Sequence, residues 1–298
     1  MRIASATVSD NIVRQIQQLG TQQSKLQAAV ASGQRVTNPS DDPAAISRLI
    51  NLESERRGLQ QFSRNADRAM EVSQASFSGL QQLKKLSDRA TEVGTLGAGT
   101  VNPDAVSAYA AEIDQLLEQA VQLGNTRFRS DFIFAGTAVD TPPFAVTRDA
   151  SGRITSVAFA GNALQAGISL SESSSITPGT TPATNAGLGD FLNRLVALRD
   201  GLSAGGGAPV AAVQPDLLAS EDLLVDALAE QGAIQMRIEV AQTQQRVRGE
   251  NLEALVSAEA DGDLASAIVA LNQTQVAYQA ALQSSANIMR LSLLDYLK

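Results

Sequence analysis

The sequence predicts a mainly α-helical protein: long antiparallel helices from both termini form a coiled-coil or helical rod, with a small β-rich insertion in mid-chain. Three observations lead to this fold class. Apolar residues recur with a helical period near both termini, further helical patterns lie between them, and the period disappears at residues 128–186. The chain has 298 residues, enough for two or three domains.

The two terminal helices are predicted from apolar series that step by four and three residues, as a heptad stripe does. The first series lies between about Asn11 and Ser32, and the second occupies the C-terminus. Neither helix can bury its stripe alone, so we expect the pair to form an assembly interface. The residues assigned to it are Ile12, Ile16, Leu19, Leu26, Val30, Leu264, Ile268, Leu271, Tyr278, Leu282 and Met289.

Further helices are predicted between the terminal ones. One runs from about Pro43 to Val93, and another starts at Asn102-Pro103. A third runs from near Pro215 to the sequence "ADGD" at 260–263, which is interpreted as a turn with a helix cap. The glycine-rich "GTLGAGT" at 94–100 joins two of these patterns and is interpreted as a loop.

The middle of the chain has strand patterns instead. The segments "PPFAVTR" and "RITSVAFAG" flank "DASG", which predicts a hairpin, and "AGISLSES" predicts a further strand. The sequence "TPGTTPATNAG" at 177–187 is interpreted as a linker, after which "LGDFLNRLVALRDGL" predicts a short helix.

These patterns divide the chain into five parts. The expected parts are an N-terminal assembly helix at 1–40, the first half of a helical core at 41–127, the β-rich insertion at 128–186, the second half of the core at 187–262, and a C-terminal assembly helix at 263–298.

The acidic stretch "NPSDDPAAIS" at 38–47 could be a metal site or the start of a helix. Asp42 followed by Pro43 is typical of an N-cap and a first helical position. A calcium site needs more oxygen ligands than this stretch offers. We therefore interpret it as a helix-start motif, which comprises Asn38, Pro39, Ser40, Asp41, Asp42 and Pro43.

Composition narrows the function classes. The chain has no histidine, cysteine or tryptophan, which removes thiol nucleophiles, histidine bases and most transition-metal sites. No P-loop is present, so we predict no enzymatic activity, no cofactor and no metal. The net charge of −8 argues against a nucleic-acid partner. We find no apolar stretch typical of a signal peptide or a membrane span, so any export is expected without a cleaved signal.

The terminal helices carry few charges. The first has only Arg14 and Lys25 between about residues 11 and 32, and the last has none before Arg290. A solvent-facing helix usually places charges on its outer face, whereas uncharged polar faces suit a helix surrounded by other helices. A compositional bias without meaning is the alternative. We favour packing into a wall made of several chains.

Four features resemble the flagellin superfamily, and within it the hook–filament junction proteins. They are "SGQRVTNPSDDPAAIS" at 32–47, "FIFAGTAVDTPPF" at 132–144, the uncharged helical C-terminus and the ending "LSLLDYLK". The "NPSDDP" form resembles the junction proteins, whereas true flagellins usually read "DDAAG" there. The likeness spans the whole chain.

This resemblance implies a structural component of the bacterial flagellum. It would join hook-associated protein 1 to the flagellin filament through paired terminal helices, and associate with itself in a junction layer. The resemblance also implies a flagellar export chaperone, type III export in an unfolded state, and an extracellular location in the flagellum.

Two alternatives remain at this point. The chain could be flagellin itself, the filament subunit, or it could be a secreted coiled-coil adaptor or effector with no axial role. An enzyme would require a substrate pocket that the sequence does not suggest.

Overall fold

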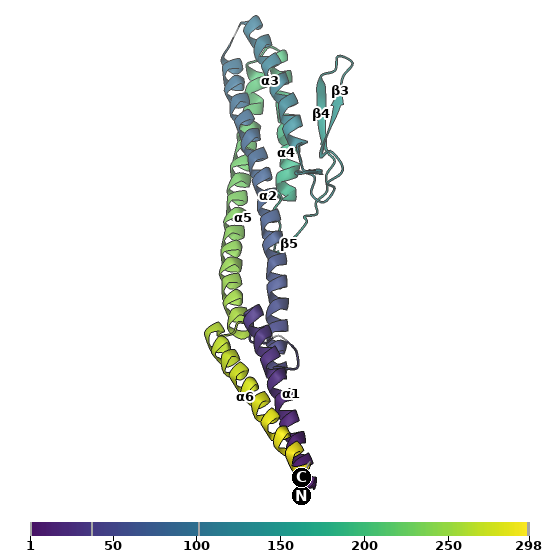
Figure 1. Cartoon of the computed structure of the whole chain (residues 1–298). Coiled ribbons are helices and arrows are strands. Elements are labelled where there is room, and N and C mark those ends of the chain that lie inside the picture. The colour runs from purple at the N-terminus through teal and green to yellow at the C-terminus, as the bar shows by residue number, and fades with distance from the viewer. Residues whose placement is uncertain (1, 37, 101, 297–298) are drawn as a thin grey trace. The chain divides into compact units, whose positions relative to one another are not determined.

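The structure is a computed structural model, and it describes residues 2–36, 38–100 and 102–296. Within these residues the chain has six helices and three two-stranded antiparallel sheets (Figure 1). The predicted fold class, mainly α with a small β-rich insertion, is confirmed. No helix in this part of the chain is both long and apolar enough to cross a bilayer.

The chain forms two compact units. We call Met1–Gly58 with Val247–Lys298 the terminal unit, and Leu59–Arg246 the central unit. Helices α2 (Pro43–Gly99) and α5 (Ala208–Ala260) each contribute residues to both.

The terminal unit contains α1 (Arg2–Ser32) and α6 (Leu264–Tyr296), which pack side by side. They run antiparallel, so the start of α1 and the end of α6 lie close together (Figure 1). Gly33 directly follows α1, has a φ of +71° and donates its N–H to the carbonyl of Ala29 at 2.8 Å. Glycine adopts this left-handed conformation without steric cost, so it ends the helix cleanly.

The central unit contains the larger core. Helices α3 (Pro103–Gly124) and α4 (Pro182–Ser203) pack against each other, and both start with a cap followed by proline. Asn102 Oδ1 accepts from the N–H of Asp104 at 3.0 Å, and Thr181 Oγ1 accepts from that of Thr184 at 3.2 Å. The largest fully buried side chains are Phe134, Phe144, Phe191, Leu80, Leu83, Ile113, Leu117, Ile154, Leu188, Leu192, Leu195 and Leu198.

The insertion is built around one hairpin. Strand β3 (Phe144–Arg148) pairs with β4 (Ile154–Phe159), so the hairpin predicted at "DASG" is confirmed. Asp149 Oδ1 stabilises the turn by accepting from the N–H groups of Ser151 at 2.8 Å and Arg153 at 3.0 Å. The amide of Asn193 on α4 bonds both the N–H and the carbonyl of Val157, at 2.9 and 2.8 Å, and so ties β4 to the helices.

Two shorter strand pairs complete the insertion. Strand β1 (Arg127–Phe128) pairs with β2 (Asp131–Phe132), and β5 (Ile168–Ser169) pairs with β6 (Ser175–Ile176). The second pair contributes to a small core with α2 and α5. This core consists of Ala66, Ala69, Leu170, Ile176, Ile234 and Ile238.

Three predicted boundaries are wrong, and packing explains each. "GTLGAGT" lies at the end of α2, because Gly94 and Gly97 leave room for the leucine side chains of α4. Helix α5 begins at Ala208 and contains Pro215, since the buried residues Val210 and Leu217 flank the proline and hold the helix on the core. The predicted linker at 177–187 is already helical from Pro182.

Candidate assembly surface

The loop after α1 and the loop before α6 are tied together within the terminal unit. The N–H of Arg35 donates to the carbonyl of Ala260 at 2.8 Å, and the N–H of Gly262 donates to that of Gly33 at 2.9 Å. The guanidinium of Arg35 also donates to the carbonyl of Glu259 at 3.1 Å. These bonds hold the loop between α1 and α2 against the loop between α5 and α6.

The helix-start motif lies in the first of these loops. Asp42 directly precedes α2, and its Oδ1 accepts from the N–H of Ala45 at 3.0 Å, which is N-cap geometry. That hydrogen bond lowers the pKa of Asp42. Asp41 pairs with the Lys25 ammonium at 2.8 Å, and this bond lowers the pKa of Asp41.

The rest of the motif forms the turn. The backbone N–H of Asn38 donates to Asp41 Oδ2 at 3.2 Å, and Pro39 and Ser40 lie in the turn before Asp41. Both aspartates therefore have cationic or backbone N–H partners. Within the described residues, no group of three or more histidine, cysteine or acidic side chains could hold a metal ion.

The sequence "ADGD" forms the matching loop before α6. Asp263 Oδ1 accepts from the N–H groups of Ala265 at 3.0 Å and Ser266 at 3.3 Å, and its Oδ2 accepts from the Ser266 hydroxyl at 2.7 Å. These bonds lower the pKa of Asp263, with the Ser266 hydroxyl contributing most. Asp263 is thus the cap of α6.

The heptad series of α1 forms one face of the helix. Its members are half-buried, and the intervening side chains are mostly exposed. Gly20 lies among them, and a Cβ placed there would be 3.7 Å from Tyr278 Cε2 on α6. The series residues that we assigned to assembly on this face are Ile12, Ile16, Leu19, Leu26 and Val30.

The residues of the C-terminal heptad series differ in how far they are buried. Leu271 and Tyr278 are half-buried, whereas Leu264, Ile268 and Leu282 are exposed at 46, 41 and 44%. The Met289 side chain lies outside the described residues.

Small polar residues occupy the most buried positions of α6 instead. Thr274 is 7% exposed and Ser285 is 5% exposed. The Thr274 hydroxyl donates to the carbonyl of Ala270 at 2.8 Å, so the helix itself satisfies it. Sequence reasoning missed this face because it followed the large apolar residues. The recurring alanine, threonine and serine at 267, 270, 274, 281 and 285 were the available signal.

Much apolar surface on α6 therefore remains uncovered within one chain. In addition to the three residues above, Val269 is 56% exposed and Val276 is 67% exposed. A helix with apolar side chains on more than one face, and no charge before Arg290, is suited to contact other helices on several sides. This surface is suited to bind other helices through apolar contacts and close packing of the backbones.

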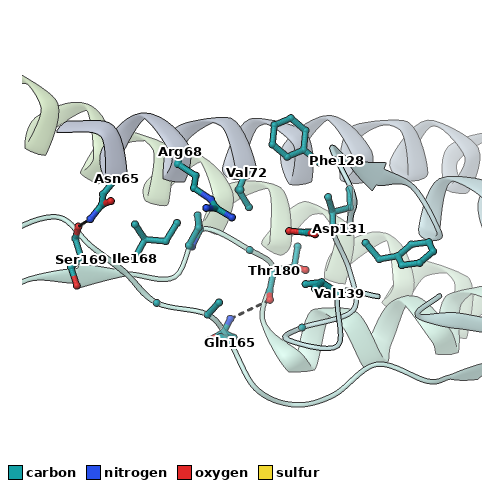
Figure 2. A pocket seen from close by; sticks show the side chains of 17 residues that line it. Asn65, Arg68, Val72, Phe128, Asp131, Val139, Gln165, Ile168, Ser169 and Thr180 are labelled. Atoms are coloured by element: carbon teal, nitrogen blue, oxygen red, sulfur yellow. Dashed lines mark hydrogen bonds between the residues drawn. The ribbon is translucent and has the colours of Figure 1, made fainter. Parts of the chain in front are cut away.

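The central unit contains a pocket of about 380 Å³ between α2 and the insertion (Figure 2). Its charged lining residues are Arg68 and Asp131, and Gln165 donates from Nε2 to the carbonyl of Thr180 at 3.1 Å. Asn65 donates to the carbonyl of Ser169 at 2.9 Å. The Asn65 bond holds the insertion against α2, and the Gln165 bond lies within the insertion. The lining contains no nucleophile with an adjacent base.

Residues 3–139 match the family model of the bacterial flagellin N-terminal helical region. A curated relative, flagellar hook-associated protein 3 of Salmonella typhimurium, is 28% identical over 146 residues. The match covers 48% of this chain and 46% of the relative, so it spans about half of the relative's length.

Solved structures share the fold. FlgL of Bacillus cereus has a TM-score of 0.60 at 18% identity, and the similarity covers 70% of this chain and 99% of that one. FlgL of Xanthomonas campestris has a TM-score of 0.56 at 13% identity, with 69% and 99% covered. A provisionally named flagellar hook-associated protein from Vibrio parahaemolyticus has a TM-score of 0.66 at 18% identity, with 74% and 100% covered.

The matched N-terminal region and the shared fold agree with the resemblance of the sequence motifs. Over residues 3–139 the chain is thus similar to the bacterial flagellin N-terminal helical region, and in fold it is similar to solved structures of flagellar hook-associated proteins.

Proposed function

We propose that the protein is a structural component of the bacterial flagellum at the hook–filament junction. It joins hook-associated protein 1 to the flagellin filament through its paired terminal helices. The observation that carries this proposal is the α1–α6 pair, which packs on small residues and leaves large apolar side chains such as Val269 and Val276 exposed. The likeness to flagellar hook-associated protein 3 supports the proposed location.

The terminal helices expose apolar side chains that could pack against helices of neighbouring subunits. One face of α6 binds α1, and the remaining apolar side chains are free to contact helices of neighbouring subunits. An isolated pair of this kind is only marginally stable in water, so burial against several chains supplies the missing stabilisation. The protein would associate with itself in one layer and bind hook-associated protein 1 and flagellin on either side.

The remaining parts of the proposal concern export. The absence of cysteine means that no disulfide obstructs passage of an unfolded chain. We propose export through the flagellar type III apparatus without a cleaved signal, assisted by a flagellar export chaperone. No enzymatic activity, cofactor or metal is part of this function.

Deletion of the gene tests the function directly. We expect cells with intact hooks that secrete flagellin into the medium without forming filaments, and full rescue by the wild-type chain. Normal filaments in the deletion strain would refute the junction role. Immunolabelling of isolated flagella separates the junction from flagellin itself: a single ring supports the proposal, and label along the whole filament supports the filament subunit.

A further inference from the structure

Helix α5 carries an exposed uncharged stripe within the central unit. Val225, Met236 and Val240 are 45, 62 and 67% exposed. Leu224 and Ile238, which are close to them in the sequence, lie on another face of the helix and are fully buried. We call this surface the outer stripe. It consists of Val225, Ala229, Gly232, Met236, Val240 and Thr243.

The spacing keeps these six residues on one face. They step by four, three, four, four and three residues, which averages the 3.6 residues per turn of a straight α-helix. The stripe is therefore about 27 Å long at 1.5 Å per residue. A solvent-facing helix normally places charged side chains at such positions. None of the six is charged, and the exposed Glu239 lies along their edge between Met236 and Thr243.

Gly232 lies in the middle of the stripe, and no contact within the chain requires a glycine at this position. A Cβ placed on it would meet no atom within 4 Å. Glycine inside a helix is less stable than alanine, and at Gly97 and Gly124 neighbouring side chains occupy the space of the missing Cβ. An open helical glycine among exposed apolar residues suits the close approach of a helix from another chain.

The charges beside the stripe indicate what approaches it. Four exposed acidic residues lie near it on α5 with one exposed base, Arg237, so this edge is acidic on balance. The acidic residues are Asp222, Asp226, Glu230 and Glu239, and none makes an ion pair with a residue that the structure describes. This acidic edge disfavours an anionic membrane or a nucleic acid.

Exposed bases lie on another helix of the same chain. Arg64 and Arg68 are one turn apart on α2 with Asp67 between them, and Lys85 lies 17 residues further along. We call these three bases the basic row, and none of them pairs with a carboxylate in the described part of the chain. Arg68 also lines the pocket of Figure 2. One chain thus presents an acidic edge and a basic row on different helices.

We propose that the outer stripe of α5 binds the α2 face of a neighbouring copy of this chain, with the acidic edge of one copy beside the basic row of the next. Such a contact joins two different surfaces, and it generates a ring when the rotation between copies closes. The proposal rests on the proposed function, because it describes the lateral contact within the junction layer.

A photo-crosslinking residue at Met236 tests the contact in isolated flagella. We expect a product that contains two copies of the chain, with the crosslinked peptide mapping to residues 64–85 of α2. The same residue at Ser151, in the exposed hairpin turn, serves as the control and should give no such product. A product with a different protein, or no product although the chain is present in the flagella, would overturn the proposal.

Gly232→Ala provides a second readout. It should raise the Tm of the purified chain by about 2–4 °C, because alanine favours the helix and meets no atom. It should also lower the amount of the chain in isolated flagella at least several-fold, because the added methyl blocks the close approach. Gln244→Ala, an exposed position of α5 outside the stripe, is the matched control and should leave that amount unchanged.

The two readouts separate the possible failures. A more stable Gly232→Ala chain that enters flagella normally would show that no helix packs at this glycine, and the lateral contact would be wrong while the junction role stands. Absence of the wild-type chain from isolated flagella would refute the junction role itself, and the inference that rests on it.

Discussion

Arg48 on α2 and Glu259 on α5 form a two-point ion pair in the terminal unit, with Nε–Oε1 and Nη2–Oε2 distances of 2.8 and 3.0 Å. The guanidinium lowers the pKa of Glu259 below its ordinary value of 4.5. Arg35, in the loop after α1, approaches the same carboxylate at 3.8 Å. One acidic side chain therefore links two helices and the loop between the terminal helix and α2.

Acid should weaken this joint. Because the folded-state pKa of Glu259 is lowered, its contribution to stability is present above the unfolded pKa and is lost as the pH falls through the folded pKa. The pKa values of Asp41 and Asp42 are also lowered, so their contributions to stability are likewise lost as the pH falls. We expect the Tm to fall progressively below about pH 4, and Glu259→Gln to have a lower Tm at pH 7 and a shallower acid dependence. Equal pH profiles for both chains, measured by thermal denaturation, would contradict this.

Asp42 should act as a helix cap and not as a metal ligand. Asp42→Ala removes the acceptor for the Ala45 N–H, so we expect a lower Tm. Asp42→Asn keeps an acceptor oxygen and should retain most of the stability. Chelators should leave the melting curve of the wild-type chain unchanged, and a large drop in Tm on adding EDTA would show that the motif holds a metal.

Arg199 should be among the most sensitive residues of the central unit. Its side chain is 3% exposed, and its guanidinium bonds Asp114 at 2.9 Å, Asp200 at 2.7 Å and the carbonyl of Ile154 at 2.6 Å. Arg199→Ala removes the donor to the Ile154 carbonyl and leaves a cavity, so we expect a loss of about 1–3 kcal/mol in the free energy of unfolding. Arg194→Ala, at a less buried arginine of the same helix, is the comparison, and equal losses in chemical denaturation would contradict the assignment.

Gly124 should not tolerate a side chain. A Cβ at this position would lie 2.6 Å from Phe144 Cδ2 and 2.9 Å from its Cε2, and that ring is 2% exposed. The neighbouring Asn125 fixes the Phe144 backbone with bonds of 2.9 and 3.0 Å, so the ring cannot move away easily. Gly124→Ala should cost about 1–3 kcal/mol through overpacking. Finding it as stable as Gly232→Ala would contradict this packing.

Charges on the terminal helices should affect assembly more than the stability of the central unit. Leu271 is half-buried on α6 in the terminal unit, so Leu271→Asp should abolish the junction while the main thermal transition stays almost unchanged. Leu271→Met keeps an apolar side chain of similar volume at the same position, so it is the control and should retain the junction. We expect hydrogen exchange on the dilute monomer to show weak protection over residues 264–289, because an isolated helix pair is marginal. Strong protection there would mean that these helices are stably folded before assembly.

The sequence by itself determined the elements whose ends depend on local chemistry. Asp42-Pro43 and Asn102-Pro103 predict helix starts because a capping oxygen and a proline without an N–H suit the first turn, and α2 and α3 begin at those prolines. The hairpin at "DASG" is equally local, since Asp149 bonds its own turn and Gly152 takes a φ of +87°. The helical period also indicated which segments are helices.

Tertiary packing decided what the local patterns could not. Gly94 and Gly97 predict a loop by composition, yet they lie in α2 because the leucines of α4 occupy the space a side chain would need. The heptad series assigned Leu264 and Ile268 to the helix pair, but Thr274 and Ser285 are the buried positions of α6. Periodicity identifies a stripe of large apolar residues, whereas the buried face of a helix depends on how closely another backbone can approach it. That distance is a property of the partner helix, and it is absent from the sequence of either helix alone.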